Sequence, residues 1–319
     1  MEIEENPIIT QSIQGLYLGN YQSVLNKLLS DEISKTRSLN MNEVRILIMR
    51  AYLCQGKIQS ALREVAKIEP ADDLASVAKN LVFLYERMSE GASKPISSDE
   101  KVVKIVENTE QLASNRLNFT KPTFIVLASL IFLHSGCFEK AMRLFYLYFK
   151  TVYFLVNSFA LMVQTYLLIN RVDMAQELLE TSKPLFEENP IYHLAESWTF
   201  LFLDGKYPEK AFYSFEELGT SNSSVTVKLL NSQASAKMNM NQNSEVENIL
   251  LEAQEKDATN SDTLANMVIS SAQNGKESYS HLLSQLEEQS PAHPFLIDME
   301  EKAELFDNLC QKYSESSTA

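Results

Sequence analysis

The chain has 319 residues, 45% of them hydrophobic, and a formal net charge of −14. Eight Gly and nine Pro are too few turn-forming residues for a protein of many β-strands, and this hydrophobic content excludes a largely disordered chain. The acidic balance disfavours direct binding to nucleic acid or to anionic membrane surfaces.

The charge is distributed unevenly along the chain. Residues 1–150 carry 18 Lys and Arg against 17 Asp and Glu, whereas residues 151–319 carry 10 against 25. Two interpretations fit the acidic half. It is either an ordinary solubilising outer face or a complement to a basic partner surface.

The N-terminus, Met1 to Glu5, is acidic and lacks the apolar segment of a signal peptide. Three cysteines, Cys54, Cys137 and Cys310, are widely separated and odd in number. They suggest neither a disulfide framework nor a zinc site, and a reducing compartment fits them best.

A short turn pattern recurs along the chain and organises its predicted elements. A Gly or Asn occurs at intervals of 37, 35, 45, 34, 35, 36 and 34 residues, at Gly19, Gly56, Gly91, Gly136, Asn170, Gly205, Asn241 and Gly275. A period of about 34 residues is that of the tetratricopeptide repeat, a helix–turn–helix unit. The sequence therefore predicts an all-α, tetratricopeptide-like solenoid of about eight degenerate units.

The residues around each turn have a physical role in such a unit. Gly and Asn tolerate the left-handed backbone that ends a helix. A small residue about five positions later, such as Ala61 or Ala141, allows the second helix to approach the first. An aromatic residue four positions earlier, such as Phe132 or Tyr166, is expected to fill the space between them.

The array is expected to form a single solenoid over residues 1–313, with residues 91–120 as a candidate looser connection. That region contains the 45-residue interval and the polar sequence GASKPISSDE at 91–100. Residues 295–313 have the pattern of a C-terminal capping helix, because acidic and apolar residues alternate there at helical spacing. Residues 314–319 are expected to be a disordered tail.

Residues 151–170 form an uncharged stretch of 20 residues, long enough to span a bilayer. Polar residues interrupt it, and the turn at Asn170 belongs to the repeat pattern. We therefore interpret this stretch as a buried helix of the solenoid.

The sequence offers no catalytic residues, no metal ligands and no cofactor-binding residues. It contains no GxxxxGK[ST], GxGxxG or GxSxG motif, and its four histidines stand apart from cysteine or carboxylate at metal-ligand spacing. We expect no enzyme and no cofactor.

A stacked array of this kind curves, and the first helix of each unit lines its concave face. On a 34-residue register, the inward-facing residues of the middle units are the candidate partner-binding residues. They are Asn157, Gln164, Tyr192, Phe202, Lys228, Asn231 and Ser235.

The C-terminal third resembles the epsilon subunit family of coatomer. The similar segments are TLANMVISSAQNGK at 263–276, HLLSQLEEQSPAHPF at 281–295 and EEKAELFDNLCQKY at 300–313. NILLEAQEKDATNSDTL at 248–264 extends the similarity upstream. Near the N-terminus, residues 17–22 and 50–53 are also similar to that family, whereas residues 71–118 show little likeness.

The resemblance implies a structural subunit of the COPI vesicle coat, cytoplasmic and peripheral on Golgi membranes and coated vesicles. Members of the family form a bracelet around a β-hairpin in the C-terminal domain of the coatomer alpha subunit, so the implied partner is that subunit and, through it, the rest of the coat. The implied role is stabilisation of that subunit in Golgi-to-ER and intra-Golgi transport, with membrane association only indirect.

The alternative is a tetratricopeptide adaptor that binds peptide tails transiently, as chaperone cofactors do. Such grooves hold a terminal carboxylate with clustered Lys, Arg and Asn side chains. Lys228 stands nearly alone as a cation among the inward-facing candidates, which argues against that alternative.

Overall fold

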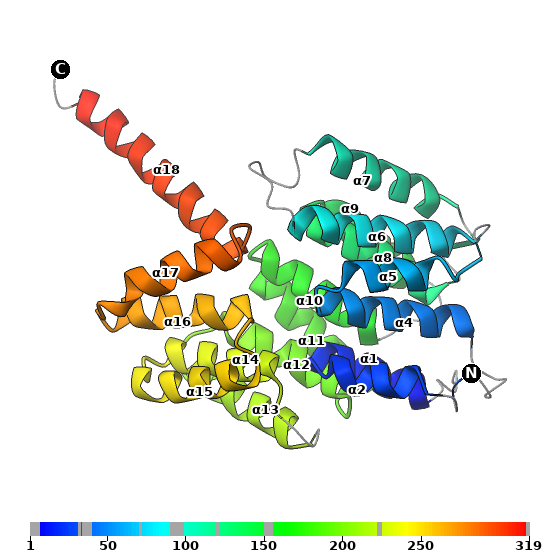
Figure 1. The fold of residues 1–319 in the computed structure, drawn as a ribbon, viewed down its shortest axis with the longest axis horizontal. Coiled ribbons are helices and arrows are strands. Elements are labelled where there is room, and N and C mark those ends of the chain that lie inside the picture. The colour runs from blue at the N-terminus through cyan, green and yellow to red at the C-terminus, as the bar shows by residue number, and fades with distance from the viewer. Residues whose placement is uncertain are drawn as a thin grey trace.

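The computed structural model describes residues 7–30, 33, 40–69, 72–89, 99–115, 117–118, 121–149, 156–221 and 225–316. Within these ranges the chain forms seventeen α-helices and no β-strand (Figure 1). The prediction of an all-α class is confirmed.

The helices follow one another as eight helix–turn–helix pairs and one final helix, α18 (Pro294–Ser316). The pairs are α1 (Pro7–Leu18) with α2 (Tyr21–Leu28), α4 (Met41–Cys54) with α5 (Ile58–Val65), α6 (Asp73–Ser89) with α7 (Glu100–Ala113), α8 (Pro122–His134) with α9 (Phe138–Phe149), α10 (Val156–Leu168) with α11 (Val172–Phe186), α12 (Pro190–Phe200) with α13 (Tyr207–Ser221), α14 (Val227–Asn239) with α15 (Asn243–Lys256), and α16 (Ser261–Gln273) with α17 (Ser278–Gln289).

The predicted turn residues have the backbone conformation that their chemistry suggests. Seven of them have φ between 57° and 90°, and they are the only positive-φ residues in the described part of the chain. Asn170 and Asn241, both at φ 57°, show asparagine taking the place of glycine in this role. Gly91 lies outside the described residues.

The small residues that follow the turns are the points of close helix contact. Ala61, Ala141, Ala175 and Ala211 have no exposed surface. The aromatic side chain of Phe132 before its turn is 2% exposed, and Phe132 belongs to the same continuous apolar core as these alanines. The pairs α4–α5, α8–α9, α10–α11 and α12–α13 thus bury a small residue of the second helix, which allows the two helices to approach closely.

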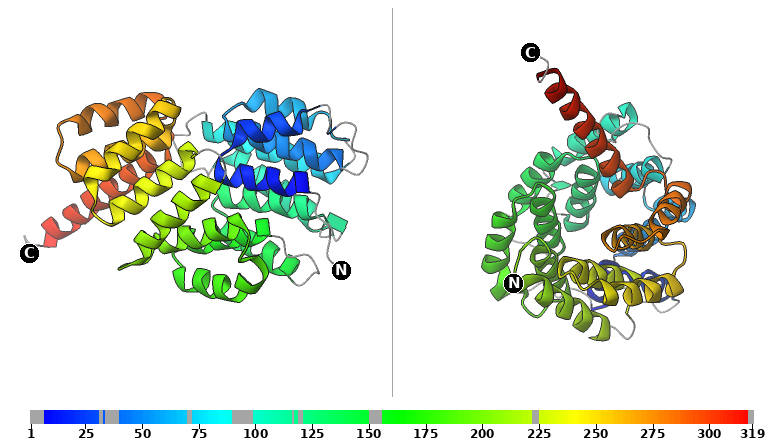
Figure 2. Two further views of the ribbon diagram at one scale, coloured as in Figure 1. Left: turned by 90° about the horizontal axis from the view of Figure 1, so that it is seen from below. Right: turned by 90° about the vertical axis from the view of Figure 1, so that its left-hand side faces the viewer.

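The array closes on itself through contacts between α1 and the middle of the chain. The Thr226 hydroxyl donates to the main-chain oxygen of Leu18 at 2.6 Å, and the same oxygen of Thr226 accepts from the main-chain N–H of Leu229 at 3.2 Å. Thr226 therefore caps the start of α14 and satisfies a carbonyl at the end of α1. The Tyr17 hydroxyl adds a 3.4 Å bond to the carbonyl of Asn157 in α10. The right panel of Figure 2 shows the resulting ring of helices around a central space.

The uncharged stretch at 151–170 is explained by its position in the ring. Its described part forms α10, a 13-residue helix that packs against α8, α9, α11 and α12. Ten of its residues are buried, because protein surrounds it on several sides. Among the described helices, none is both long enough and apolar enough to cross a membrane.

The two ends of the predicted domain plan are described only in part. The region 91–120 contains α7, while residues 91–98, 116 and 119–120 lie outside the described residues. The helix α18 packs its first residues, including Leu296, against α16 and α17, and then projects away from the ring (Figure 1). It continues to Ser316, so residues 314–316 of the predicted tail are helical, and residues 317–319 lie outside the described residues.

Candidate functional site

The ring encloses a hollow with two connected chambers, which we call the apolar chamber and the polar chamber. Both are lined by Tyr21, Cys54, Tyr85 and Lys228, which marks where one chamber continues into the other. The volumes are about 450 Å³ for the apolar chamber and about 1180 Å³ for the polar chamber.

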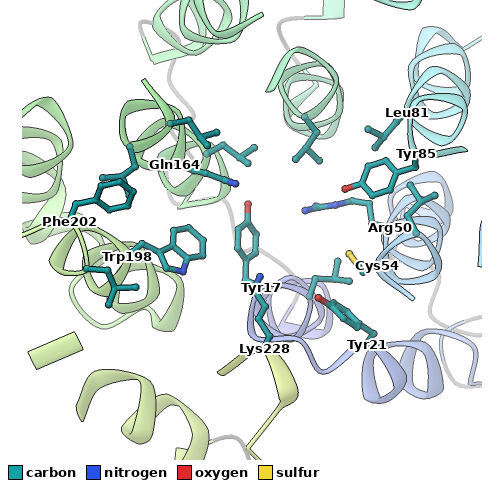
Figure 3. Close-up of a pocket in the computed structure, with 17 residues that line it drawn as sticks. Tyr17, Tyr21, Arg50, Cys54, Leu81, Tyr85, Gln164, Trp198, Phe202 and Lys228 are labelled. Carbon is teal, nitrogen blue, oxygen red and sulfur yellow. The ribbon is translucent and has the colours of Figure 1, made fainter. Parts of the chain in front are cut away.

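The apolar chamber takes its walls almost entirely from the first helices of seven successive units. Aromatic side chains of α1, α6 and α12 point toward its centre, and Figure 3 shows Tyr17, Tyr85 and Trp198 converging there. Its lining residues are Leu16, Tyr17, Tyr21, Arg50, Leu53, Cys54, Leu81, Tyr85, Leu130, Leu161, Gln164, Leu167, Leu168, Trp198, Leu201, Phe202 and Lys228. Large, rigid aromatic walls of this kind can bury another chain's side chains at little entropic cost.

One position relative to the turn recurs among the lining residues of several units. Arg50, Tyr85, Leu130 and Gln164 each stand six residues before the turn residue of their unit, as do Ser235 and Ile269 in the polar chamber. Trp198 stands seven before Gly205, in the unit where the pattern is shifted by one residue. In these units, six residues before the turn is therefore one position of the first helix that faces the hollow, whereas Ile13, at the same distance before Gly19, lines neither chamber.

Two cations project into the apolar chamber without a carboxylate partner. Arg50 of α4 and Lys228 of α14 both line it, and within the described residues neither has an Asp or Glu oxygen within 4.0 Å. The Lys228 ammonium lies 5.9 Å from the centre of the Trp198 ring, close enough for a cation–π contact.

The surroundings of the apolar chamber shift the pKa values of Lys228 and Tyr17. The protein around Lys228 displaces part of its hydration shell and lowers its pKa from the ordinary value, although the side chain remains solvent-accessible. Burial raises the pKa of Tyr17, and the neighbouring guanidinium of Arg50 offsets part of that rise. Both effects show that the positive charges are held close to low-polarity walls.

The polar chamber contains an amide network between α14 and α16. The Asn231 amide donates to the Thr263 hydroxyl at 2.9 Å, and the Asn266 amide donates to the Asn231 side-chain oxygen at 3.0 Å. Amide side chains both donate and accept, so this wall can bond the main chain of an extended segment whatever its sequence.

Five of the seven predicted partner-binding residues line the hollow. Gln164 and Phe202 line the apolar chamber, Asn231 and Ser235 line the polar chamber, and Lys228 lines both. Phe202 lies in the turn after α12, with 54% of its side chain exposed.

The other two predicted residues do not line either chamber. Tyr192 is 2% exposed in the core, where its ring stacks on Phe159 at 5.6 Å and its hydroxyl donates to the Leu179 carbonyl at 3.2 Å. Asn157 is 6% exposed and contributes only its main-chain oxygen, to Tyr17. Both lie in the first turn of their helices, thirteen residues before a turn residue, where the helix faces its neighbours in the ring and not the hollow.

The sequence interpretation missed Arg50, Tyr17, Tyr85 and Trp198. The predicted residues belong to the middle units of the array, whereas Tyr17, Arg50 and Tyr85 lie on α1, α4 and α6. The position six before each turn would have selected Arg50 and Tyr85.

No group of three or more His, Cys, Asp or Glu side chains in the described ranges is arranged to hold a metal ion. The hollow combines apolar walls, amides and unpaired cations, which are the features of a surface that binds protein.

The fold and the lined hollow define the class of protein: a helical-repeat solenoid of the tetratricopeptide type, curled into a ring. Solved structures with the same fold include Cut9 with Hcn1 in a hetero-tetramer of the APC/C, at a TM-score of 0.60 and 11% identity over 93% of this chain and 55% of that one. A tetratricopeptide repeat protein from Parabacteroides merdae has a TM-score of 0.54 at 13% identity, over 80% of this chain and 97% of that one.

The chain belongs to the coatomer epsilon subunit family, whose model matches residues 12–314. Coatomer subunit epsilon-2 of Arabidopsis thaliana is 28% identical over 87% of both chains. Coatomer subunit epsilon of Dictyostelium discoideum is 24% identical over 94% of this chain and 96% of its own. Family membership supports a structural role as a subunit of the COPI coat.

Proposed function

We propose that this chain binds and stabilises the C-terminal region of the coatomer alpha subunit by enclosing a segment of it in the central hollow. In this proposal it is a non-catalytic part of the COPI coat, cytoplasmic and recruited to Golgi membranes and vesicles only through its partner. Its trafficking steps are Golgi-to-ER and intra-Golgi transport.

The observation that carries the proposal is the lined hollow of the closed ring. An exposed apolar surface that is enclosed on several sides, with aromatic residues at its centre, is typical of a site for a partner's side chains. Because the apolar chamber continues into an amide-lined chamber, an extended segment can place side chains in the first and main chain in the second.

Purification of a tagged copy tests the proposal. We expect the alpha subunit and the other coatomer subunits to co-purify in stable proportion. Phe202→Asp is expected to weaken recovery of the alpha subunit at least tenfold, because it places a charge against the apolar wall. The matched control is Leu185→Asp on α11, which is 72% exposed and lines neither chamber.

Recovery of the chain without coatomer subunits, or equal losses with the two variants, would contradict the proposal. Circular dichroism of both variants separates a binding defect from unfolding.

The transient adaptor remains the second candidate, and one observation now favours it. Lys228 does not stand alone in the hollow, because Arg50 faces the same chamber. The two functions differ in how long the partner stays bound. A permanent subunit should stay bound through gel filtration for hours, whereas an adaptor should exchange with added free peptide within seconds to minutes.

A further inference from the structure

The positive charge of the apolar chamber is unbalanced, although the chain as a whole is strongly acidic. Two cations and no carboxylate are among the described residues that line this chamber. A chain with net charge −14 has many acidic side chains that could have neutralised Arg50 and Lys228, yet among the described residues none forms an ion pair with either of them.

The other charges around the hollow are satisfied locally. Asp262 of the polar chamber pairs with His293 at 3.1 Å, and Asp257 accepts from Thr259 at 2.7 Å. Lys256 pairs with Glu252 at 3.3 Å and donates to the Val225 carbonyl. Lys57 of the polar chamber donates to the Gln55 side-chain oxygen at 2.8 Å. Among the described residues, Arg50 and Lys228 are the two cations of the apolar chamber, and the charge of Asp262 acts on Lys228 only from beyond ion-pair distance.

This arrangement is costly in the free chain. Each cation lies beside aromatic and leucine side chains that offer it no opposite charge, and the like charge of Arg50 contributes to the lowered pKa of Lys228. A carboxylate placed between them would remove both penalties and accept charge-assisted hydrogen bonds from each.

We propose that the segment held in the hollow carries an Asp or Glu side chain that lies between Arg50 and Lys228, flanked by apolar side chains against Trp198 and Phe202. This inference rests on the proposed function, because it assigns the chemistry of the segment that the hollow encloses. A side-chain carboxylate fits better than a terminal one, because the two chambers are continuous and a chain can pass through both.

Affinity for the isolated C-terminal region of the alpha subunit, measured at low and high salt, tests the inference. Arg50→Met and Lys228→Met remove the charge and keep an unbranched apolar stem. We expect each to raise the Kd at least tenfold at low salt and to reduce the loss of affinity on adding salt. Lys104→Met is the matched control, since Lys104 is exposed on α7 and lines neither chamber.

A second arm identifies the carboxylate. Each Asp and Glu of the bound segment is changed to Asn or Gln, and one of these changes should weaken binding as much as Arg50→Met does. Combined with Arg50→Met, that change should cost less than the product of the two separate effects. If extending the partner's C-terminus reproduces the loss and no side-chain change does, the ligand is a terminal carboxylate and the proposal of a side chain is overturned.

The outcomes separate the two claims. If the wild-type chain binds the alpha region and Arg50→Met and Lys228→Met bind it as tightly, the carboxylate inference is overturned and the proposed function stands. If the wild-type chain fails to bind the alpha region, the proposed function fails and the inference falls with it. Thermal melts of the free variants, expected to give a Tm equal to or higher than that of the wild type, show that any loss is not due to unfolding.

Discussion

His134 illustrates how a single side chain at the rim of the hollow adapts to its surroundings. It is the last residue of α8, and its Nε2 and the Tyr85 hydroxyl are hydrogen-bonded at 3.1 Å, with the two rings edge to face at 5.1 Å. The hydroxyl can donate to an unprotonated Nε2 or accept from an Nε2–H, so the bond itself is compatible with either protonation state of the ring. Burial lowers the pKa of His134 below its ordinary value.

The lowered pKa predicts an effect of pH on stability. Below pH 6.5 the unfolded chain binds a proton at His134 that the folded chain does not, so stability falls as pH falls from that value toward the folded pKa. We expect His134→Gln, which keeps an acceptor but cannot titrate, to lose less in Tm than the wild type between pH 7.5 and 5.5. Equal losses in parallel melts would contradict this role for His134.

The residues of the hollow were predictable to the extent that the turn register fixes which side of a helix faces inward. Gln164 and Ser235 follow from that register directly. Tyr192 does not, because its helix begins only two residues earlier and the first turn faces the Phe159 ring of the neighbouring unit. Predicting Arg50 would have required knowing that α1 contacts the middle of the chain, which places α4 on the wall of the same enclosed space.

At the scale of the helical pair, nearly all of the structure was predictable from the sequence. The requirement for a left-handed residue after each first helix is local and steric, so Gly or Asn at a regular interval located the turns. The small and aromatic residues around each turn likewise pack against residues nearby in the sequence, so they were predictable for the same reason. The projection of α18 was not predictable, since Leu305 and Phe306 have the apolar spacing of packed residues and yet are 59% and 66% exposed.

Gly19 has a second constraint that Gly56, Gly136, Gly205 and Gly275 lack. A Cβ at Gly19 would lie 3.0 Å from the Lys228 Cβ and 3.2 Å from the Thr226 Oγ1, whereas a Cβ at Gly136 would meet nothing within 4 Å. Both glycines have positive φ, at 90° and 73°. Gly19 is thus the turn residue at which the ring closes.

We expect Gly136→Ala to cost about 1 kcal/mol, which is the penalty for an alanine at positive φ. Gly19→Ala should cost roughly 2–3 kcal/mol, because the added methyl group also presses on α14. Chemical denaturation of the two variants compares them directly. Equal destabilisation would mean that the contact between α1 and α14 contributes little to the folded chain.

At the scale of the whole molecule, closure turns a curved array into an enclosing one. A solenoid's curvature is the sum of small rotations between successive units, so it could not be read from any one repeat. The bond from Thr226 to Leu18 joins residues 208 positions apart and closes the ring. The inner wall then brings together residues from seven units. Although the chain as a whole is acidic, this wall carries the two cations Arg50 and Lys228.

The proposed function requires that the partner lie inside the ring. Site-specific photo-cross-linking in intact coatomer tests this directly, with a benzophenone amino acid in place of Gln164 in the apolar chamber or of Leu185 on α11. We predict a cross-link to the alpha subunit from position 164 and none from position 185. A cross-link from position 185 alone, with the complex intact, would place the partner outside the ring and contradict the account.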